Sequence, residues 1–345
     1  MRLYASKLTL ALLTVSGLGI AVQAQAARNT VQIAGSSTVL PFASIVAEEF
    51  GNTYPQYKAP VVASGGSSGG FRQFCQGIGD NTIDIANASR PIKSAEIEAC
   101  KKAGVSQIHE VKFGYDGIVF ASRSDKPAFK LKPQHVYSAL AAQVPSKDNK
   151  LMPNPYTRWS QIDKSLPNQE IILIIPASNH GTREVFEEKV VHPGCNAYTY
   201  NKKLSEGDNK KACSTFRKDG RVIEISGDYT ETLARLQSSP NAVGVFGLSF
   251  YEQNRDRLRV ATVNGVVPSE ATITSGKYSV SRPLYFYVKG QHLNRISGLT
   301  QYVEYFLNDK VSGAGSQLQN AGLIPLPKAE RAKALASFKS RQKVK

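Results

Sequence analysis

Three short apolar segments of the chain each end in a loop of small residues and lead into a helical spacing of apolar positions. The first segment covers residues 30–34 and passes through glycine and hydroxyl residues into an amphipathic stretch, residues 39–50. Proline is tolerated only in the first turn of a helix, so Pro41 predicts that this helix begins near Ser37 or Thr38. We expect the order strand, small loop, helix to be the unit from which the fold is built.

The second unit contains the loop 64–70, which consists of glycine and serine only. It follows a β-branched pair and precedes a helical pattern that begins at Phe71. A helix N-terminus presents unpaired N–H groups and about half a positive charge, so it attracts anions. Ser67 and Ser68 are either helix caps or hydroxyl donors to an oxyanion, and Gly69 lets the backbone approach a ligand.

The third unit begins with the strongly apolar residues 170–175 and continues through a loop into a helix predicted over residues 183–190. A single unit of this kind is as often an ordinary capped turn as an anion site. Because this unit of strand, loop and helix occurs three times in the chain, we expect the three loops to converge on one anion.

Strands and helices alternate along most of the chain, which predicts an α/β fold with mainly parallel sheets covered on both faces. A short strand is predicted over residues 83–86, and the segment that follows it, residues 87–91, contains Ser89 and Arg90. Two glycines surround Tyr115 and Asp116, between the predicted strands 108–113 and 118–121. This arrangement suits a strand that crosses from one domain to another.

The N-terminus has the pattern of a cleavable export signal. Positive residues precede an apolar stretch over residues 8–22, and small residues then offer a cleavage site, so we assign residues 1–26 to a signal peptide. A membrane anchor is the alternative, but the apolar run is short and no later run is long enough to cross a bilayer. The first cysteine is Cys75, too far from the signal to carry a lipid. We therefore expect a free periplasmic protein.

Four cysteines suit an exported protein and allow three pairings. We favour Cys75–Cys100 and Cys195–Cys213, because each pair lies within one local unit of the chain. Zinc binding is the competing use of cysteine, but the sequence has no close Cys or Cys/His spacing typical of such a site. We therefore expect two disulfides, and neither a metal nor a cofactor.

The formal charge of +16 gives the molecule a positive field that attracts anions. The same charge suits nucleic acid or an anionic membrane, but the sequence contains no nucleic-acid module and no aromatic ladder interleaved with basic residues. Much of the charge lies in residues 328–345, which predict a solvated, frayed helix. A basic surface without a specific ligand is the remaining alternative.

Six short motifs follow one another along the chain: residues 35–38 (GSST), 66–70 (GSSGG), 84–90 (DIANASR), 180–183 (HGTR), 242–244 (AVG) and 281–284 (SRPL). In this order they resemble the phosphate-binding periplasmic proteins of the PstS type. The resemblance implies a two-lobed, type II periplasmic-binding-protein fold with strands crossing between the lobes. Residues 28–116 plus 283–345 would form lobe 1, and residues 117–282 would form lobe 2.

The resemblance also implies a function and a ligand set. It implies that the chain binds inorganic phosphate or a similar oxyanion between its lobes and delivers it to an ABC-type permease, and we expect a monomer. The residues that match the family's anion-binding loops are Ser37, Thr38, Ser67, Ser68, Gly69, Ser89, Gly181 and Thr182.

The chain departs from the family pattern at two charged positions. Arg90 stands where the family has an acceptor aspartate, and Pro176 stands where it has an arginine. We predict that Arg90 and Arg183 face the ligand, because guanidinium groups bind phosphate well, and that Asp116 replaces the missing acceptor. The missing acceptor leaves discrimination against sulfate open.

The alternative function is that of a serine hydrolase or phosphatase. Residues 65–69 fit the Gly-x-Ser-x-Gly pattern of a nucleophile elbow at Ser67, with His180 downstream and Asp84 or Asp116 between them. The loop contains more glycines and serines than one nucleophile needs. We therefore expect a binding protein and not an enzyme.

Overall fold

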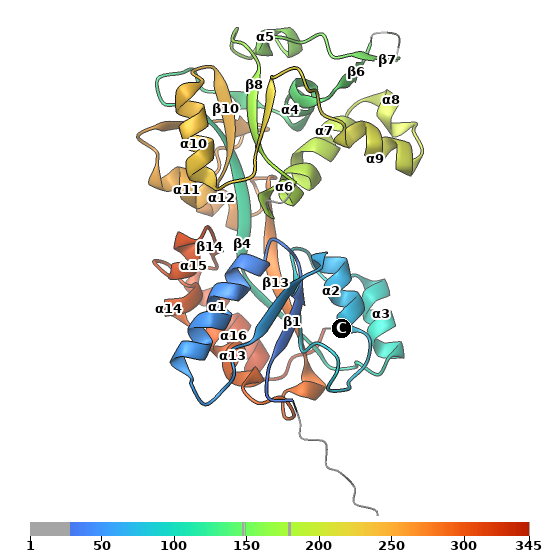
Figure 1. Ribbon diagram of the computed structural model, residues 1–345, viewed down its shortest axis with the longest axis vertical. Coiled ribbons are helices and arrows are strands. Elements are labelled where there is room, and N and C mark those ends of the chain that lie inside the picture. The colour runs from blue at the N-terminus through green and yellow to red at the C-terminus, as the bar shows by residue number, and fades with distance from the viewer. Residues whose placement is uncertain (1–27, 147, 149, 179–180, 345) are drawn as a thin grey trace, which may run out of the picture.

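The computed structural model describes residues 28–146, 148, 150–178 and 181–344, and it consists of two α/β lobes stacked end to end (Figure 1). We use the predicted ranges as names: lobe 1 for residues 28–116 plus 283–345, and lobe 2 for residues 117–282. The predicted signal peptide and His180 lie outside the described residues. The two-lobed α/β architecture predicted from the sequence is confirmed.

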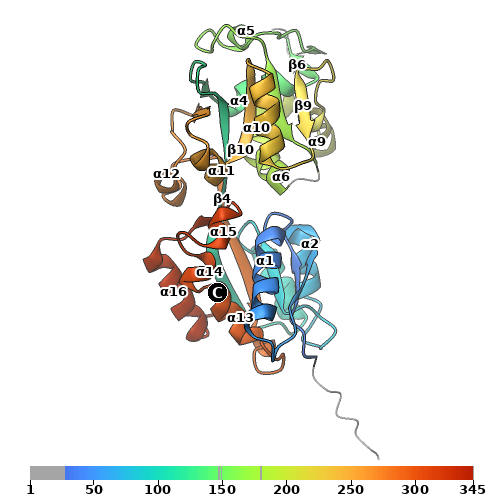
Figure 2. The same ribbon diagram turned by 60° about the vertical axis from the view of Figure 1, so that its left-hand side comes forward.

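Two long strands run between the lobes and hold them together (Figures 1 and 2). Strand β4 (Ile108–Arg123) pairs with β13 (Ser281–Lys289) as far as Gly117 and with β10 (Ala242–Gly247) from Ile118 onward. The predicted strands 108–113 and 118–121 are parts of this one continuous strand, and the predicted crossing between the lobes is present. At Gly114 a Cβ atom would lie 2.5 Å from Leu323 Cδ1, so this glycine permits close packing.

Lobe 1 is built on the parallel strands β2, β1 and β3, which continue into β13 and β4 in the order β2-β1-β3-β13-β4. Apolar clusters cover both faces of this sheet. Its remaining elements and their bounds are β1 (Gln32–Gly35), α1 (Leu40–Thr53), β2 (Val61–Ser64), α2 (Gly66–Phe74), β3 (Ile85–Ala88), α3 (Ser94–Lys102), η2 (Gly290–His292), α13 (Leu299–Phe306), α14 (Asp309–Ser312), α15 (Gln317–Asn320), β14 (Ile324–Pro325) and α16 (Lys328–Lys339).

Lobe 2 continues the sheet from β4 through β10, β8 and β9, and it has its own large apolar core. The elements of this lobe are β5 (Lys130–Leu131), α4 (Pro133–Leu140), β6 (Gln143–Pro145), β7 (Leu151–Pro153), α5 (Trp159–Ile162), β8 (Ile172–Pro176), α6 (Gly181–Phe186), η1 (Glu187–Val191), α7 (His192–Asn196), α8 (Thr199–Lys202), α9 (Glu206–Ser214), β9 (Val222–Ile225), α10 (Tyr229–Ser238), α11 (Leu248–Gln253), β11 (Leu258–Val260), β12 (Thr262–Val263) and α12 (Glu270–Thr274).

Two predicted helix starts differ from the structure. Helix α1 begins at Leu40 with Val39 as its N-cap, slightly later than predicted, and Pro41 lies in its first turn as expected. Helix α2 begins at Gly66 and not at Phe71, so most of the predicted loop is helical. Glycine at position 70 allows the helix to pack closely on β1, because a Cβ atom there would lie 2.6 Å from a backbone carbon of that strand.

The helix predicted for the C-terminal residues is present as α16, but it is not frayed. It packs against the rest of lobe 1, with Phe338 buried in the core. Arg331 is also buried; it donates to the Asp309 carboxylate at 2.6 and 2.9 Å and to the Leu326 carbonyl. The basic tail is thus anchored by apolar packing and by ion pairs with the rest of lobe 1.

Both predicted disulfides are present. Cys75–Cys100 joins the end of α2 to α3, and Cys195–Cys213 joins α7 to α9. In the part of the chain that the structure describes, no helix is long and apolar enough to cross a membrane.

Candidate functional site

The loops of lobe 1 meet at the carboxyl ends of its three parallel strands, where ligands bind in open α/β sheets. The chain leaves β1 through Gly35, whose backbone has φ +144° and lies against Asn87 of β3. Ser36 N donates to Asn87 O and Gly65 N donates to Gly35 O, each at 2.9 Å. These backbone contacts hold the first and second loops beside the end of β3.

The first loop presents two hydroxyl groups toward lobe 2. Ser37 Oγ and Thr38 Oγ1 each donate at 3.3 Å to Glu184 Oε2 on helix α6. Thr38 also accepts a short hydrogen bond from Arg282. Because α1 has Val39 as its N-cap, these hydroxyls precede the helix and reach across the cleft.

The second loop lies beside the first, and its Ser67 side chain turns inward, whereas Ser68 is exposed. Ser67 Oγ accepts from the Ser89 backbone N–H at 3.1 Å and lies 3.3 Å from Ser89 Oγ. Both serines are buried, as is Gly69 in the first turns of α2. Ser67 and Ser89 therefore brace the two loops against each other within lobe 1.

Arg90 is held by a carboxylate of its own lobe. It donates to Glu96 Oε1 and Oε2 at 2.7 and 2.8 Å and to Ser68 Oγ at 2.9 Å. These hydrogen bonds raise the pKa of Arg90 further above its already high value. The predicted contact of Arg90 and Ser68 with a ligand stays a prediction, but the ion pair with Glu96 argues against it for Arg90.

The third loop leads into α6 of lobe 2. Thr182 Oγ1 lies 2.5 Å from Tyr229 Oη, directly after Gly181 at the start of the helix. Burial raises the pKa of Tyr229, so this phenol is neutral. Thr182 is itself buried, and it lines the same small cavity as Thr38 of lobe 1.

Arg183 points away from this cavity into lobe 2. Its guanidinium donates to Glu187 at 2.6 Å, to Glu224 at 2.9 Å and to the Pro176 carbonyl at 2.9 Å. It also stacks over the ring of Phe216 at 4.8 Å. These contacts give Arg183 a structural role, and its predicted ligand contact stays a prediction.

Arg282 is a cation of the cleft, and it was not predicted from the sequence as a site residue. It lies on β13 opposite Asp116 of β4 and is only 2% exposed. Its guanidinium donates to Thr38 of lobe 1 and to Glu188 Oε2 of lobe 2 at 3.2 Å. The available signal was the motif SRPL, in which a charged residue opens a buried strand.

Three carboxylates surround this guanidinium. Besides Glu188, they are Glu184, whose Oε2 lies 3.5 Å from Arg282 Nη2, and Asp116, whose Oδ2 lies 3.7 Å from Arg282 Nε. These last two atoms, Nε and Oδ2, are buried and make no hydrogen bond within the described part of the chain. Burial raises the pKa of Asp116, an effect that Arg282 opposes and Glu184 strengthens.

A cavity of about 180 Å³ lies between the lobes at this point, and residues of both lobes line it. It has the size for a small anion, and hydroxyl groups and one carboxylate line it. Residues of both lobes and of the crossing strand contribute, among them Thr38, Phe42, Asp116, Thr182, Tyr229 and Gln253.

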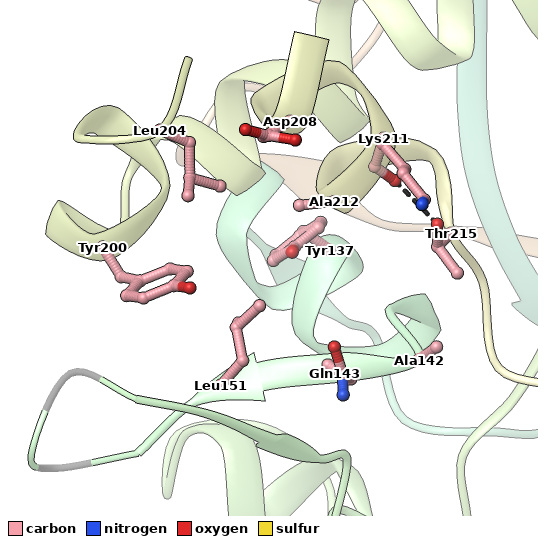
Figure 3. A pocket seen from close by; sticks show the side chains of 10 residues that line it. All are labelled: Tyr137, Ala142, Gln143, Leu151, Tyr200, Leu204, Asp208, Lys211, Ala212 and Thr215. Carbon is pink, nitrogen blue, oxygen red and sulfur yellow. Dashed lines mark hydrogen bonds between the residues drawn. The ribbon is translucent and has the colours of Figure 1, made fainter. Parts of the chain in front are cut away.

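A larger hollow of about 520 Å³ lies in lobe 2 (Figure 3), and it shares no lining residue with the cleft cavity. Leu151, Tyr200 and Leu204 form its apolar walls, and Lys211 lies at its edge. None of the predicted anion loops reaches this hollow. The cleft cavity is therefore the candidate site.

The hydrolase alternative is not supported by the geometry. Ser67 Oγ contacts Ser89, and Asp84 lies at the opposite end of β3, where it binds Arg28 and His292. Among the described residues no three His, Cys, Asp or Glu side chains gather as metal ligands. The histidine predicted to act as base, His180, lies outside the described residues.

The chain is similar in sequence to proteins of a known family. The PBP superfamily domain matches residues 21–310. Protein SphX from Synechococcus elongatus is 31% identical over 324 residues, which cover 92% of this chain and 84% of SphX. The phosphate-binding protein PstS from Staphylococcus epidermidis is 28% identical over 305 residues, which cover 85% of this chain and 78% of PstS.

Solved structures show the same fold. A possible phosphate binding protein from Planctomyces limnophilus superposes with a TM-score of 0.70 and 25% identity, covering 92% of this chain and 100% of that one. PstS from Borrelia burgdorferi superposes with a TM-score of 0.58 and 19% identity, covering 87% of this chain and 100% of that one.

Proposed function

This chain belongs to the PBP superfamily, and we propose that it captures inorganic phosphate between its lobes and delivers it to an ABC-type permease. The observation that carries the proposal is the interlobe cavity lined by Thr38 and Asp116, beside which the buried guanidinium of Arg282 donates to the Thr38 hydroxyl. Relatives named for phosphate binding support the choice of anion.

The cleft supplies both kinds of group that a protonated oxyanion needs. Arg282 and the hydroxyls of Thr38 and Thr182 can donate to its oxygens, and charge-assisted bonds of this kind are the strong ones. Asp116 lies beside the guanidinium, and we propose it as the acceptor for a phosphate proton. We propose that Ser67, Ser68, Gly69, Ser89 and Gly181 complete the anion site. The contact between Ser67 and Ser89 holds two of its segments together.

We further propose that the chain acts in the periplasm as a monomer. The signal pattern of residues 1–26 supports export, and the placement of the first cysteine, Cys75, in a disulfide supports release without a lipid. Closure of the lobes about the crossing strands would shield the bound anion from water.

Isothermal titration of the purified protein with phosphate tests the proposal. We expect micromolar or tighter binding, with sulfate at least about tenfold weaker, because the Asp116 carboxylate repels an anion that carries no proton. No heat with phosphate would overturn the proposed function. Equal binding of sulfate would leave an oxyanion receptor and remove Asp116 as its selectivity group.

A further inference from the structure

Glu184 of lobe 2 occupies a position that an oxyanion oxygen would take. Its Oε2 atom accepts from Ser37 Oγ and Thr38 Oγ1 at 3.3 Å, and it lies 3.5 Å from Arg282 Nη2. One carboxylate oxygen thus gathers two hydroxyl donors of lobe 1 and the cation of the crossing strand.

A carboxylate oxygen and a phosphate oxygen are alike as hydrogen-bond acceptors, since both carry negative charge and accept from hydroxyl and guanidinium donors. We propose that Glu184 is an internal anion that holds the donors of the phosphate site until phosphate displaces it, and that it thereby sets the affinity and clasps the lobes. This inference rests on the proposed function and deepens it.

The charges in the cleft require such a displacement. Arg282 already has three carboxylates within 3.7 Å, so a phosphate dianion placed beside it meets strong repulsion unless one of them leaves. Glu184 is the carboxylate that accepts from both hydroxyls, so its departure gives up that acceptor position to phosphate. Its side chain is 44% exposed, so solvent can receive it, whereas the side chain of Asp116 is only 15% exposed.

The competition has a defined effect on binding. Phosphate can bind only to the fraction of molecules in which Glu184 has moved away. The apparent affinity is therefore the intrinsic affinity multiplied by that fraction. Glu184 on α6 also connects lobe 2 to Ser37 and Thr38 of lobe 1, so the same contact favours closed lobes before phosphate arrives.

The test compares phosphate titrations of the wild type, Glu184→Ala, Glu184→Gln and the control Glu188→Gln, all freed of phosphate by dialysis. Glu188 also contacts Arg282, at 3.2 Å, and its side chain is 47% exposed. The carboxylate that accepts from the Ser37 and Thr38 hydroxyls, however, is that of Glu184. We expect Glu184→Ala to bind phosphate at least tenfold more tightly, Glu184→Gln to lie between it and the wild type, and Glu188→Gln to change less than threefold.

Equal or weaker binding by Glu184→Ala would overturn the proposal, as would equal tightening by Glu188→Gln, which would show a simple charge effect. A second measurement separates this failure from that of the proposed function. Spin-labelled amino acids at the exposed positions Lys58 and Lys164 report the distance between the lobes without phosphate. A longer distance in Glu184→Ala supports the clasp even if no variant binds phosphate, and an unchanged distance overturns it.

Discussion

Replacing Arg282 with glutamine is expected to weaken phosphate binding about 100-fold or more in isothermal titration. Arg282 is 2% exposed, and it is the cation that joins Thr38 of lobe 1 to the acidic side chains of lobe 2. Hydrogen bonds to charged groups contribute roughly 1.5–3 kcal/mol each, and about 1.4 kcal/mol is a factor of ten in affinity. The loss also leaves neighbouring carboxylates without their cation, which adds repulsion against the anion.

Two further variants sharpen this prediction. Arg282→Lys keeps the charge but not the planar fork, so we expect an intermediate affinity. Arg295→Gln is the matched control, because Arg295 pairs with Asp80 at the surface of lobe 1 and is expected to leave affinity unchanged within about twofold. Wild-type affinity in a folded Arg282→Gln protein would remove this residue from the site.

Gly35→Ala is expected to destabilise the protein by about 3–5 kcal/mol in chemical denaturation and to disrupt the anion loop. Two costs add at this position: backbone strain, because φ is +144°, and overpacking, because the new Cβ atom would lie 2.1 Å from Asn87 O. Gly35 ends β1 directly before the first loop, so any shift that relieves the clash moves Ser37 and Thr38.

The control for this prediction is Gly207→Ala in α9, where the added Cβ atom meets open space. Alanine is the better helix former, so we expect this variant to be as stable as the wild type or more stable by about 0.5–1 kcal/mol. An unfolding midpoint of Gly35→Ala that equals that of the wild type would contradict the close contact between Gly35 and Asn87 of β3.

The sequence predicted those features of the fold that depend on neighbours along the chain. The repeated strand, loop and helix units and both disulfides are local, and they are present. The errors at α2 and α16 have one cause. Glycines read as a loop become helical where α2 packs closely on β1, and a charged tail orders where Phe338 and Arg331 find partners in the folded lobe.

The candidate site was harder to predict, because its charge pairs join distant parts of the chain. Arg183 is held by Glu224, 41 residues away, and no local pattern shows that pairing. Arg282 enters the cleft through the register of β13 on β4, which places it opposite Asp116. Only the folded sheet reveals which arginine lies beside Thr38 and Asp116, two residues that line the cavity.

The central claim is that one oxyanion binds between the lobes beside Arg282. Arsenate has the shape and protonation of phosphate, and its arsenic atom is located directly by anomalous X-ray scattering from a crystal grown with it. We predict a single strong arsenic peak in the interlobe cavity, within hydrogen-bonding reach of the Arg282 guanidinium and the Thr38 hydroxyl. A peak elsewhere, on the basic C-terminal helix α16 or in the hollow of lobe 2, would contradict the account.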